Sequence, residues 1–87
     1  MTAYILYNLG TPAEGWAKDF GERLKREQVD NELLDADSPR GIDLAEHYDV
    51  LARPAIVLLK DDGAVMGVWQ GEETIPPVSE IAYLAHQ

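Results

Sequence analysis

The chain of 87 residues contains no cysteine and few basic side chains. The absence of cysteine excludes disulfides, thiolate metal ligands and thiol nucleophiles. Seven Lys and Arg residues against 16 Asp and Glu residues give a formal charge of −9. Nucleic acids and anionic membranes are bound by clustered bases. We therefore expect neither a nucleic-acid nor a membrane partner.

Long hydrophobic segments are missing as well. Apolar runs such as Ala55 to Leu59 are far shorter than the ~20 residues of a transmembrane helix. Met1 to Ala3 leads directly into Tyr4, without a basic segment or a cleavage site of small residues. A cytoplasmic location is therefore predicted. Residues 1–87 are expected to form one domain, since domains run roughly 50–200 residues.

The hydrophobic pattern alternates between strand and helix periods. Strands are predicted at residues 3–9, 29–36, 55–59 and 64–70. Helices are predicted after Thr11-Pro12, after Ser38-Pro39 and after Pro76-Pro77. The order β-α-β-α-β-β-α predicts an α/β fold in which a parallel crossover joins the first two strands. A final hairpin makes the four-stranded sheet mixed, with helices on both faces.

The junction between the first strand and the first helix carries a helix-start signature. Gly10 stops the strand, Thr11 can cap the helix, and Pro12 suits its first position. Glu14, three residues after Thr11, predicts a capping box in which the two side chains bond each other's backbone N–H groups. Trp16 lies on the apolar stripe of this helix and is predicted to belong to the core.

Residues 35–71 carry a resemblance to a known family. Pro54 opens the continuous apolar strand, Asp62-Gly63 forms the hairpin turn, and Gly71 follows the hairpin. Together with the order of elements, these features resemble the thioredoxin superfamily in its small, glutaredoxin-sized form. The resemblance implies a thioredoxin-like fold in which Pro54 follows a cis peptide bond and faces the site of the family's redox motif.

The chain departs from this family at the redox motif itself. The resemblance puts Thr11 at the position of the nucleophilic cysteine and Glu14 at that of the resolving cysteine. Disulfide exchange requires a thiolate, so thiol–disulfide oxidoreductase activity is excluded. Thr11 has no His or Lys within the motif that could activate its hydroxyl. The chain is therefore expected to bind rather than to catalyse.

The leading hypothesis is a redox-inactive module that binds a protein or an extended peptide. In relatives the backbone of the residue before the cis-proline pairs with extended substrates. The candidate binding groove comprises Thr11, Pro12, Glu14, Arg53, Pro54, Gly71 and Glu72. A solvated Arg53 side chain and a solvated acidic loop at Glu72 are the alternatives to contacts there. Trp69 either anchors a partner or belongs to the core.

A second hypothesis is a glutathione-binding or glutathione-transferase-like protein that uses Thr11 in place of cysteine. The alternative role of Thr11 is helix capping alone. A third is a structural module that self-associates. No resident cofactor or metal is predicted, because His47 and His86 have no second ligand at a suitable spacing.

Overall fold

A mixed four-stranded sheet forms the centre of the molecule, as the computed structural model shows for residues 1–87. The elements are β1 (Thr2–Tyr7), α1 (Pro12–Arg26), β2 (Asp30–Asp35), α2 (Pro39–His47), β3 (Ala55–Leu59), β4 (Val65–Gln70), the short 3-10 helix η1 (Glu72–Thr74) and α3 (Val78–Ala85). This order confirms the predicted α/β fold. The first strand ends two residues before its predicted end, because Asn8 and Leu9 already belong to the turn into α1.

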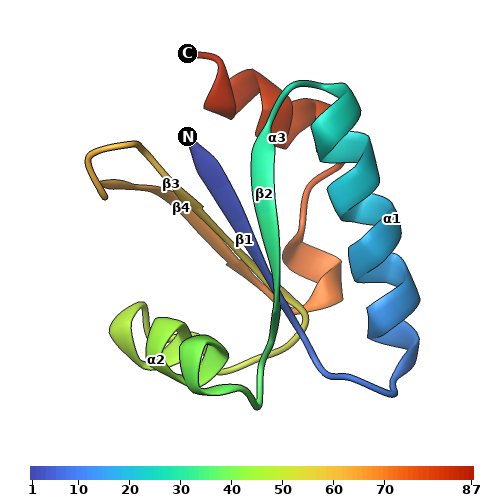
Figure 1. Ribbon diagram of the computed structural model, residues 1–87. Helices are drawn as coiled ribbons and strands as arrows, with labels where there is room; N and C mark the ends of the chain where they lie inside the picture. The colour runs from blue at the N-terminus through green and yellow to red at the C-terminus, as the bar shows by residue number, and fades with distance from the viewer.

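The strands lie in the order β2-β1-β3-β4 (Figure 1). β1 pairs with β2 in parallel, with Ile5 opposite Leu33, and with β3 in antiparallel orientation, with Ile5 opposite Ile56. β4 closes the sheet as the antiparallel partner of β3. The continuous apolar run of β3 is explained by its place inside the sheet, where both of its faces are covered.

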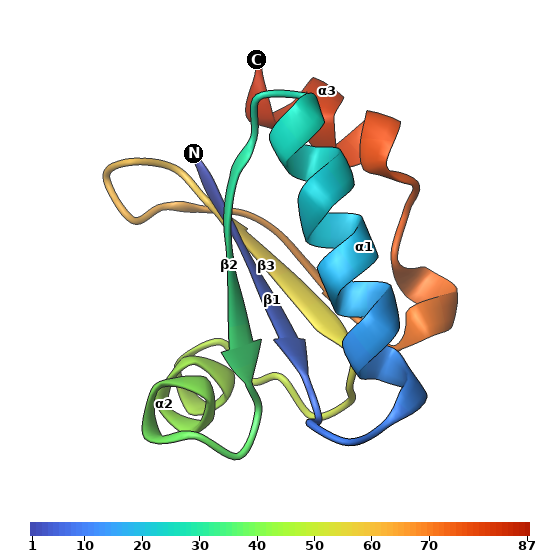
Figure 2. The same ribbon diagram turned by 45° about the vertical axis from the view of Figure 1, so that its right-hand side comes forward.

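Helices cover both faces of the sheet, as predicted. Figures 1 and 2 show α1 and α3 on one face and α2 on the other. The side chains of Ile5, Ile56 and Leu58 are fully buried against α1 and α3, while Leu6 and Val57 are fully buried on the α2 face. Burial of each such side chain contributes about 1.5–3 kcal/mol. The two cores therefore stabilise the sheet, and the sheet fixes the positions of the loops at its ends.

Trp16 lies at the rim of this core rather than inside it. It is half-buried and packs beside Phe20, with 5.1 Å between the ring centroids. The prediction that Trp16 belongs to the core is therefore confirmed only in part, because Trp16 packs against the core without being fully buried. None of the helices is both long enough and apolar enough to cross a bilayer.

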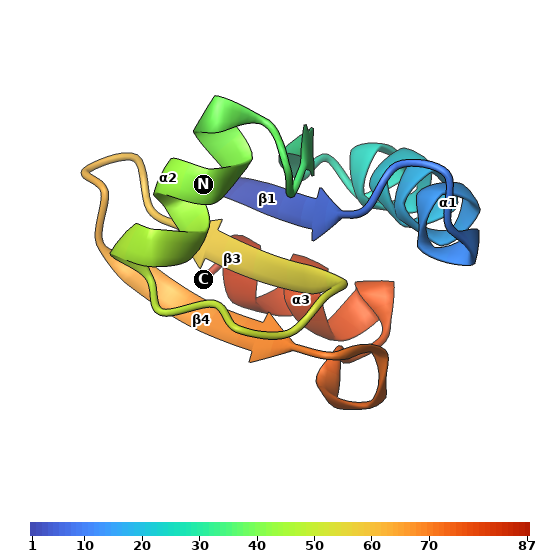
Figure 3. The ribbon, with the colours of Figure 1, turned by 90° about the horizontal axis from the view of Figure 1, so that it is seen from below.

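One end of the sheet gathers most of the loops that the sequence singled out. β1, β2 and β4 end there and β3 begins there, because β3 runs opposite to the other three strands. Figure 3 views the molecule from this end. α2 begins here and packs closely, since a Cβ at Gly41 would lie 2.1 Å from the carbonyl oxygen of Asp35. Any larger residue would push α2 away from β2.

Candidate functional site

The junction between β1 and α1 differs from the predicted capping box. The Thr11 side chain makes no capping bond, and its Oγ1 instead donates to the carbonyl oxygen of Asn8 at 2.6 Å. Glu14 Oε1 accepts from the N–H of Gly10 at 3.0 Å, not from that of Thr11. Gly10 adopts a φ of 75°, which turns the chain so that its own N–H reaches Glu14. The capping-box prediction was therefore wrong.

The carboxylate of Glu14 is held by two partners. The N–H of Gly10 and the Nζ of Lys18, which lies 3.2 Å from Oε2, together lower the pKa of Glu14 from its ordinary value. The backbone bond is the larger cause, and both partners favour the ionised form. Thr11 and Pro12 are exposed at the same junction. The Thr11 hydroxyl and the Glu14 carboxylate thus stabilise the loop between β1 and α1 and the first turn of α1.

The loop before β3 carries the cis peptide bond that the resemblance implied, between Arg53 and Pro54. Pro54 is buried, and its carbonyl oxygen accepts from the N–H of Gly71 at 2.9 Å. Gly71 has a φ of 85°, a conformation that glycine adopts without strain. The structure therefore brings together Pro54 and Gly71, two of the predicted site residues.

Gln70 holds this loop in place, a role that the sequence did not indicate. Its Oε1 accepts from the N–H groups of Leu51 at 2.7 Å and Ala52 at 3.4 Å, and its Nε2 donates to the carbonyl oxygen of Asp49 at 3.2 Å. One side chain therefore satisfies three backbone groups of an irregular segment. A glutamine at the end of a strand is common, so no sequence signal distinguished it.

Arg53 is the residue of this loop in which both backbone groups are unpaired. It is exposed in a bend, and neither its N–H nor its C=O has a hydrogen-bond partner within the chain. Its guanidinium forms no ion pair. Because Pro54 and Gln70 fix the backbone on both sides, these free groups are presented by an ordered segment. Such a pair can accept the backbone of an added strand.

The junction and the Pro54 loop are neighbours. Leu6 lies opposite Ala55 in the antiparallel pairing of β1 and β3, and the same register extended by one residue sets Tyr7 opposite Pro54. Tyr7 also accepts from the N–H of Ala36 at 2.8 Å, which ties the end of β1 to the start of the α2 loop. The predicted residues of the two segments therefore lie at one end of the sheet.

Two exposed leucines at this end were missed in the sequence. Leu9 follows β1 and is 57% exposed, and Leu51 precedes the Pro54 loop and is 88% exposed. Figure 3 shows both of their loops at the viewer's end of the sheet. We call the following residues the loop surface: the exposed Leu9, Thr11, Pro12, Leu51, Arg53 and Glu72, and the partly buried Gly71. A single exposed leucine carries no signal in a sequence, because folded proteins expose many apolar side chains.

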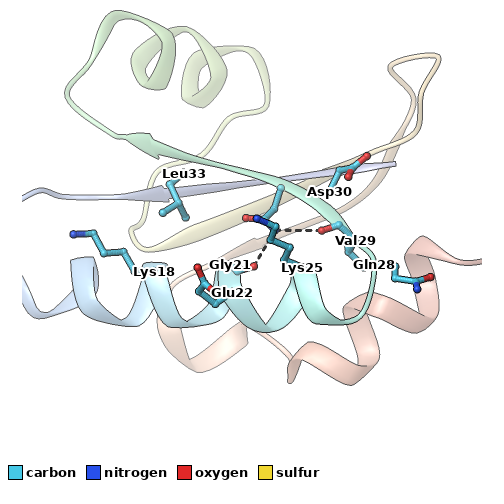
Figure 4. A pocket seen from close by; sticks show the side chains of 9 residues that line it. Lys18, Gly21, Glu22, Lys25, Gln28, Val29, Asp30 and Leu33 are labelled. Carbon is cyan, nitrogen blue, oxygen red and sulfur yellow. Dashed lines mark hydrogen bonds between the residues drawn. The ribbon is translucent and has the colours of Figure 1, made fainter.

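The principal hollows of the molecule lie away from the loop surface. One, of about 780 Å³, lies between α1 and β2 and is lined mainly by polar residues, among them Lys18, Glu22 and Lys25. Figure 4 shows Leu33 directed from β2 toward α1 in this hollow. A second, of about 410 Å³, lies beside α2. The loop surface is thus open and suits an extended segment better than an enclosed small molecule.

The loop surface holds no group suited to nucleophilic chemistry. It contains no thiol, and the Thr11 hydroxyl is already used as a donor. No cluster of three or more His, Asp or Glu side chains in the structure is placed to hold a metal ion. What this surface offers is a free backbone N–H and C=O, two apolar side chains and one guanidinium.

Comparison with known proteins agrees with the geometry. No protein-family model and no curated protein matches the chain. Thioredoxin 1 from the thermophilic eubacterium Thermosipho africanus has a solved structure that is similar over 99% of this chain and 91% of its own, with a TM-score of 0.71 and 13% identity. A structure of a malarial protein is similar over 95% of this chain and 90% of its own, with a TM-score of 0.70 and 15% identity.

A solution structure of a thioredoxin from Thermus thermophilus is similar over 98% of this chain and 71% of its own, with a TM-score of 0.59 and 20% identity. Likeness at these identities shows the fold and nothing finer. The chain therefore has a thioredoxin-like fold and lacks the Cys-x-x-Cys motif.

Proposed function

We propose that this thioredoxin-fold chain is a redox-inactive module that binds an extended segment of a protein partner through the loop surface. The observation that carries the proposal is Arg53, whose backbone N–H and C=O are exposed and unpaired next to the buried Pro54. A segment that passes Arg53 in extended form would gain two backbone hydrogen bonds there. Each such bond contributes about 0.5–1.5 kcal/mol net.

The exposed leucines support the apolar part of this recognition. Leu9 and Leu51 are exposed to 57% and 88%, so an apolar side chain of the partner could cover surface that now faces water. Burial of apolar surface is worth roughly 25 cal/mol per Å². A partner segment with an apolar residue on each side of its Arg53 contact would therefore fit this surface.

Peptides selected from a random display library against the immobilised chain would test the proposal. We expect them to perturb the amide signals of Leu9, Leu51, Arg53 and Gly71 in the isotope-labelled chain. Leu51→Asp should weaken their binding at least about tenfold, because it loses apolar contact and places a charge there. Tyr83→Asp is the matched control, since Tyr83 is 67% exposed on α3, and it should bind as the parent does.

A perturbation confined to α3 or to the outer face of α2 would contradict the proposal, as would equal effects of Leu51→Asp and Tyr83→Asp. Reduced glutathione is titrated in parallel. The Thr11 hydroxyl donates to Asn8 at 2.6 Å and would have to break that bond to reach a thiolate. We therefore expect no shift at Thr11, and saturable shifts there would favour the glutathione-binding alternative.

A further inference from the structure

The two edges of the sheet differ in charge. β2 and β4 are the edge strands. β2 carries three acidic residues in six, Asp30, Glu32 and Asp35, which discourage an added strand. β4, with the sequence Val-Met-Gly-Val-Trp-Gln, carries neither a charge nor a proline. An edge without such protection is a template for pairing with another chain.

The regular part of the β4 edge is short and defined. Leu58 pairs with Gly67 and Leu59 with Val65, so Met66 is an extra residue that interrupts the ladder. Regular pairing therefore runs from Gly67 to Gln70. Beyond the pairing with β3, the one backbone group of these four residues that is already bonded is the Gln70 carbonyl oxygen, which accepts from the Thr74 hydroxyl at 2.6 Å. An added strand would be in contact with Gly67 to Gln70.

Trp69 lies within this stretch. It is half-buried against the core on the α1 and α3 face, and its ring lies along Gly67, where a Cβ would meet the ring at 2.5 Å. Its indole N–H makes no hydrogen bond in the chain, and it is not buried either. Tryptophan with one buried side and one free donor is typical of interface anchors.

The charges at the two ends of β4 decide which partner fits. Beyond Gln70, Glu72 and Glu73 are exposed and form no ion pair. At the other end the α-ammonium of Met1, 2.8 Å from Asp61, and the ammonium of Lys60 are matched by the carboxylates of Asp61 and Asp62, so this end carries no net charge. The acidic end is thus the Glu72 end, and the whole chain carries −9. A second acidic copy is disfavoured there, and a basic partner is favoured.

We infer that β4 accepts a short extended segment of a different protein, apolar at its centre and with Lys or Arg at the end that meets Glu72 and Glu73. In antiparallel pairing this is the amino end of the segment, and its side chain opposite Trp69 packs on the indole. The inference shares only Glu72 with the loop surface and uses none of Thr11, Arg53 and Pro54. Its test variant, Glu73→Lys, lies outside that surface, so it does not depend on the function proposed there.

The probe is a short synthetic peptide with alternating valine and threonine and a lysine pair at its amino end. Titrated into the isotope-labelled chain, it should shift the amides of Gly67 to Gln70 and the indole N–H of Trp69. The same peptide with glutamates in place of the lysines should bind much more weakly. Glu73→Lys should weaken binding of the lysine peptide about 3- to 10-fold, while Asp30→Lys at the other edge leaves it unchanged.

Equal binding of the two peptides, or equal effects of Glu73→Lys and Asp30→Lys, would overturn the inference. So would shifts centred on β2 or on Arg53, or the absence of binding. Sedimentation over a range of concentrations tests whether a second copy of the chain pairs with β4 instead. A dimer that the parent forms and that Glu73→Lys strengthens would show that β4 pairs with a second copy, which also contradicts the inference.

Discussion

The β1–α1 junction and the Pro54 loop lie side by side but use their polar groups in opposite ways. At the junction the Thr11 hydroxyl bonds Asn8, and the Glu14 carboxylate bonds Gly10 and Lys18, so both side chains are occupied. In the Pro54 loop, Gln70 and Gly71 hold the backbone while the N–H and C=O of Arg53 stay free. The junction therefore uses its polar side chains within the chain, whereas the Pro54 loop leaves a backbone N–H and C=O unpaired.

The largest change would come from cysteines placed at the junction. Thr11 and Glu14 are three residues apart at the start of α1, a spacing whose Cα–Cα distance suits a disulfide. We expect the double variant Thr11→Cys, Glu14→Cys to form an intramolecular disulfide and to reduce insulin measurably, whereas the parent gives a blank. Failure to form the disulfide would show that the junction does not keep the geometry of the redox motif.

A smaller effect, on the free energy of unfolding, is expected when the hydrogen bonds that hold the Pro54 loop are removed. Gln70→Leu removes three hydrogen bonds to Asp49, Leu51 and Ala52, and should lower the free energy of unfolding by about 1–3 kcal/mol. Denaturant unfolding measures the loss. Gln70→Glu keeps the oxygen that accepts from Leu51 and Ala52, so it should lose less. Equal losses would mean that the acceptor bonds do not hold the loop.

The Thr11 hydroxyl should contribute less to the free energy of unfolding than the Gln70 side chain does. Thr11→Val keeps the shape of the side chain and removes its bond to Asn8, which should cost about 0.5–1.5 kcal/mol in the free energy of unfolding. Thr11→Ser retains a hydroxyl and should lie close to the parent. A Val variant as stable as the parent would show that the hydroxyl is free for another role.

The smallest effect concerns pH. The pKa of Glu14 is lowered from its ordinary value of 4.5, first by the N–H of Gly10 and then by Lys18. Its ionised form therefore stabilises the fold above that value, and this contribution disappears as the pH falls through the lower pKa of the folded state. The stability of the parent relative to Glu14→Gln should follow this course in denaturant titrations at several pH values. A stability difference between the parent and Glu14→Gln that stays constant over this pH range would contradict the assignment.

The sequence predicted the order and type of the elements because their periods were clear. The continuous run of β3 indicated an inner strand, and Ser38 caps α2 by accepting from Gly41, as the Ser38-Pro39 signal predicted. The cis bond before Pro54 was available only through the resemblance. Local signals were therefore sufficient for the start of α2, but not at the β1–α1 junction, where the positive φ of Gly10 redirects the bond of Glu14.

Where contacts join distant segments, sequence reasoning was insufficient. Gln70 reaches residues 18 to 21 positions away, a contact that no local pattern encodes. Leu9 and Leu51 come to the same end of the sheet only because β1 and β3 are antiparallel. The site therefore depends on tertiary contacts more than the fold does.

Amide hydrogen exchange at Arg53 tests the proposed binding mode most directly. In the free chain this N–H has no acceptor and is exposed, so it should exchange as fast as an unstructured amide. In the complex with a display-selected peptide it should become protected while Leu51, already bonded to Gln70, changes little. An Arg53 amide that still exchanges freely when the chain is saturated with peptide would contradict strand pairing at this surface.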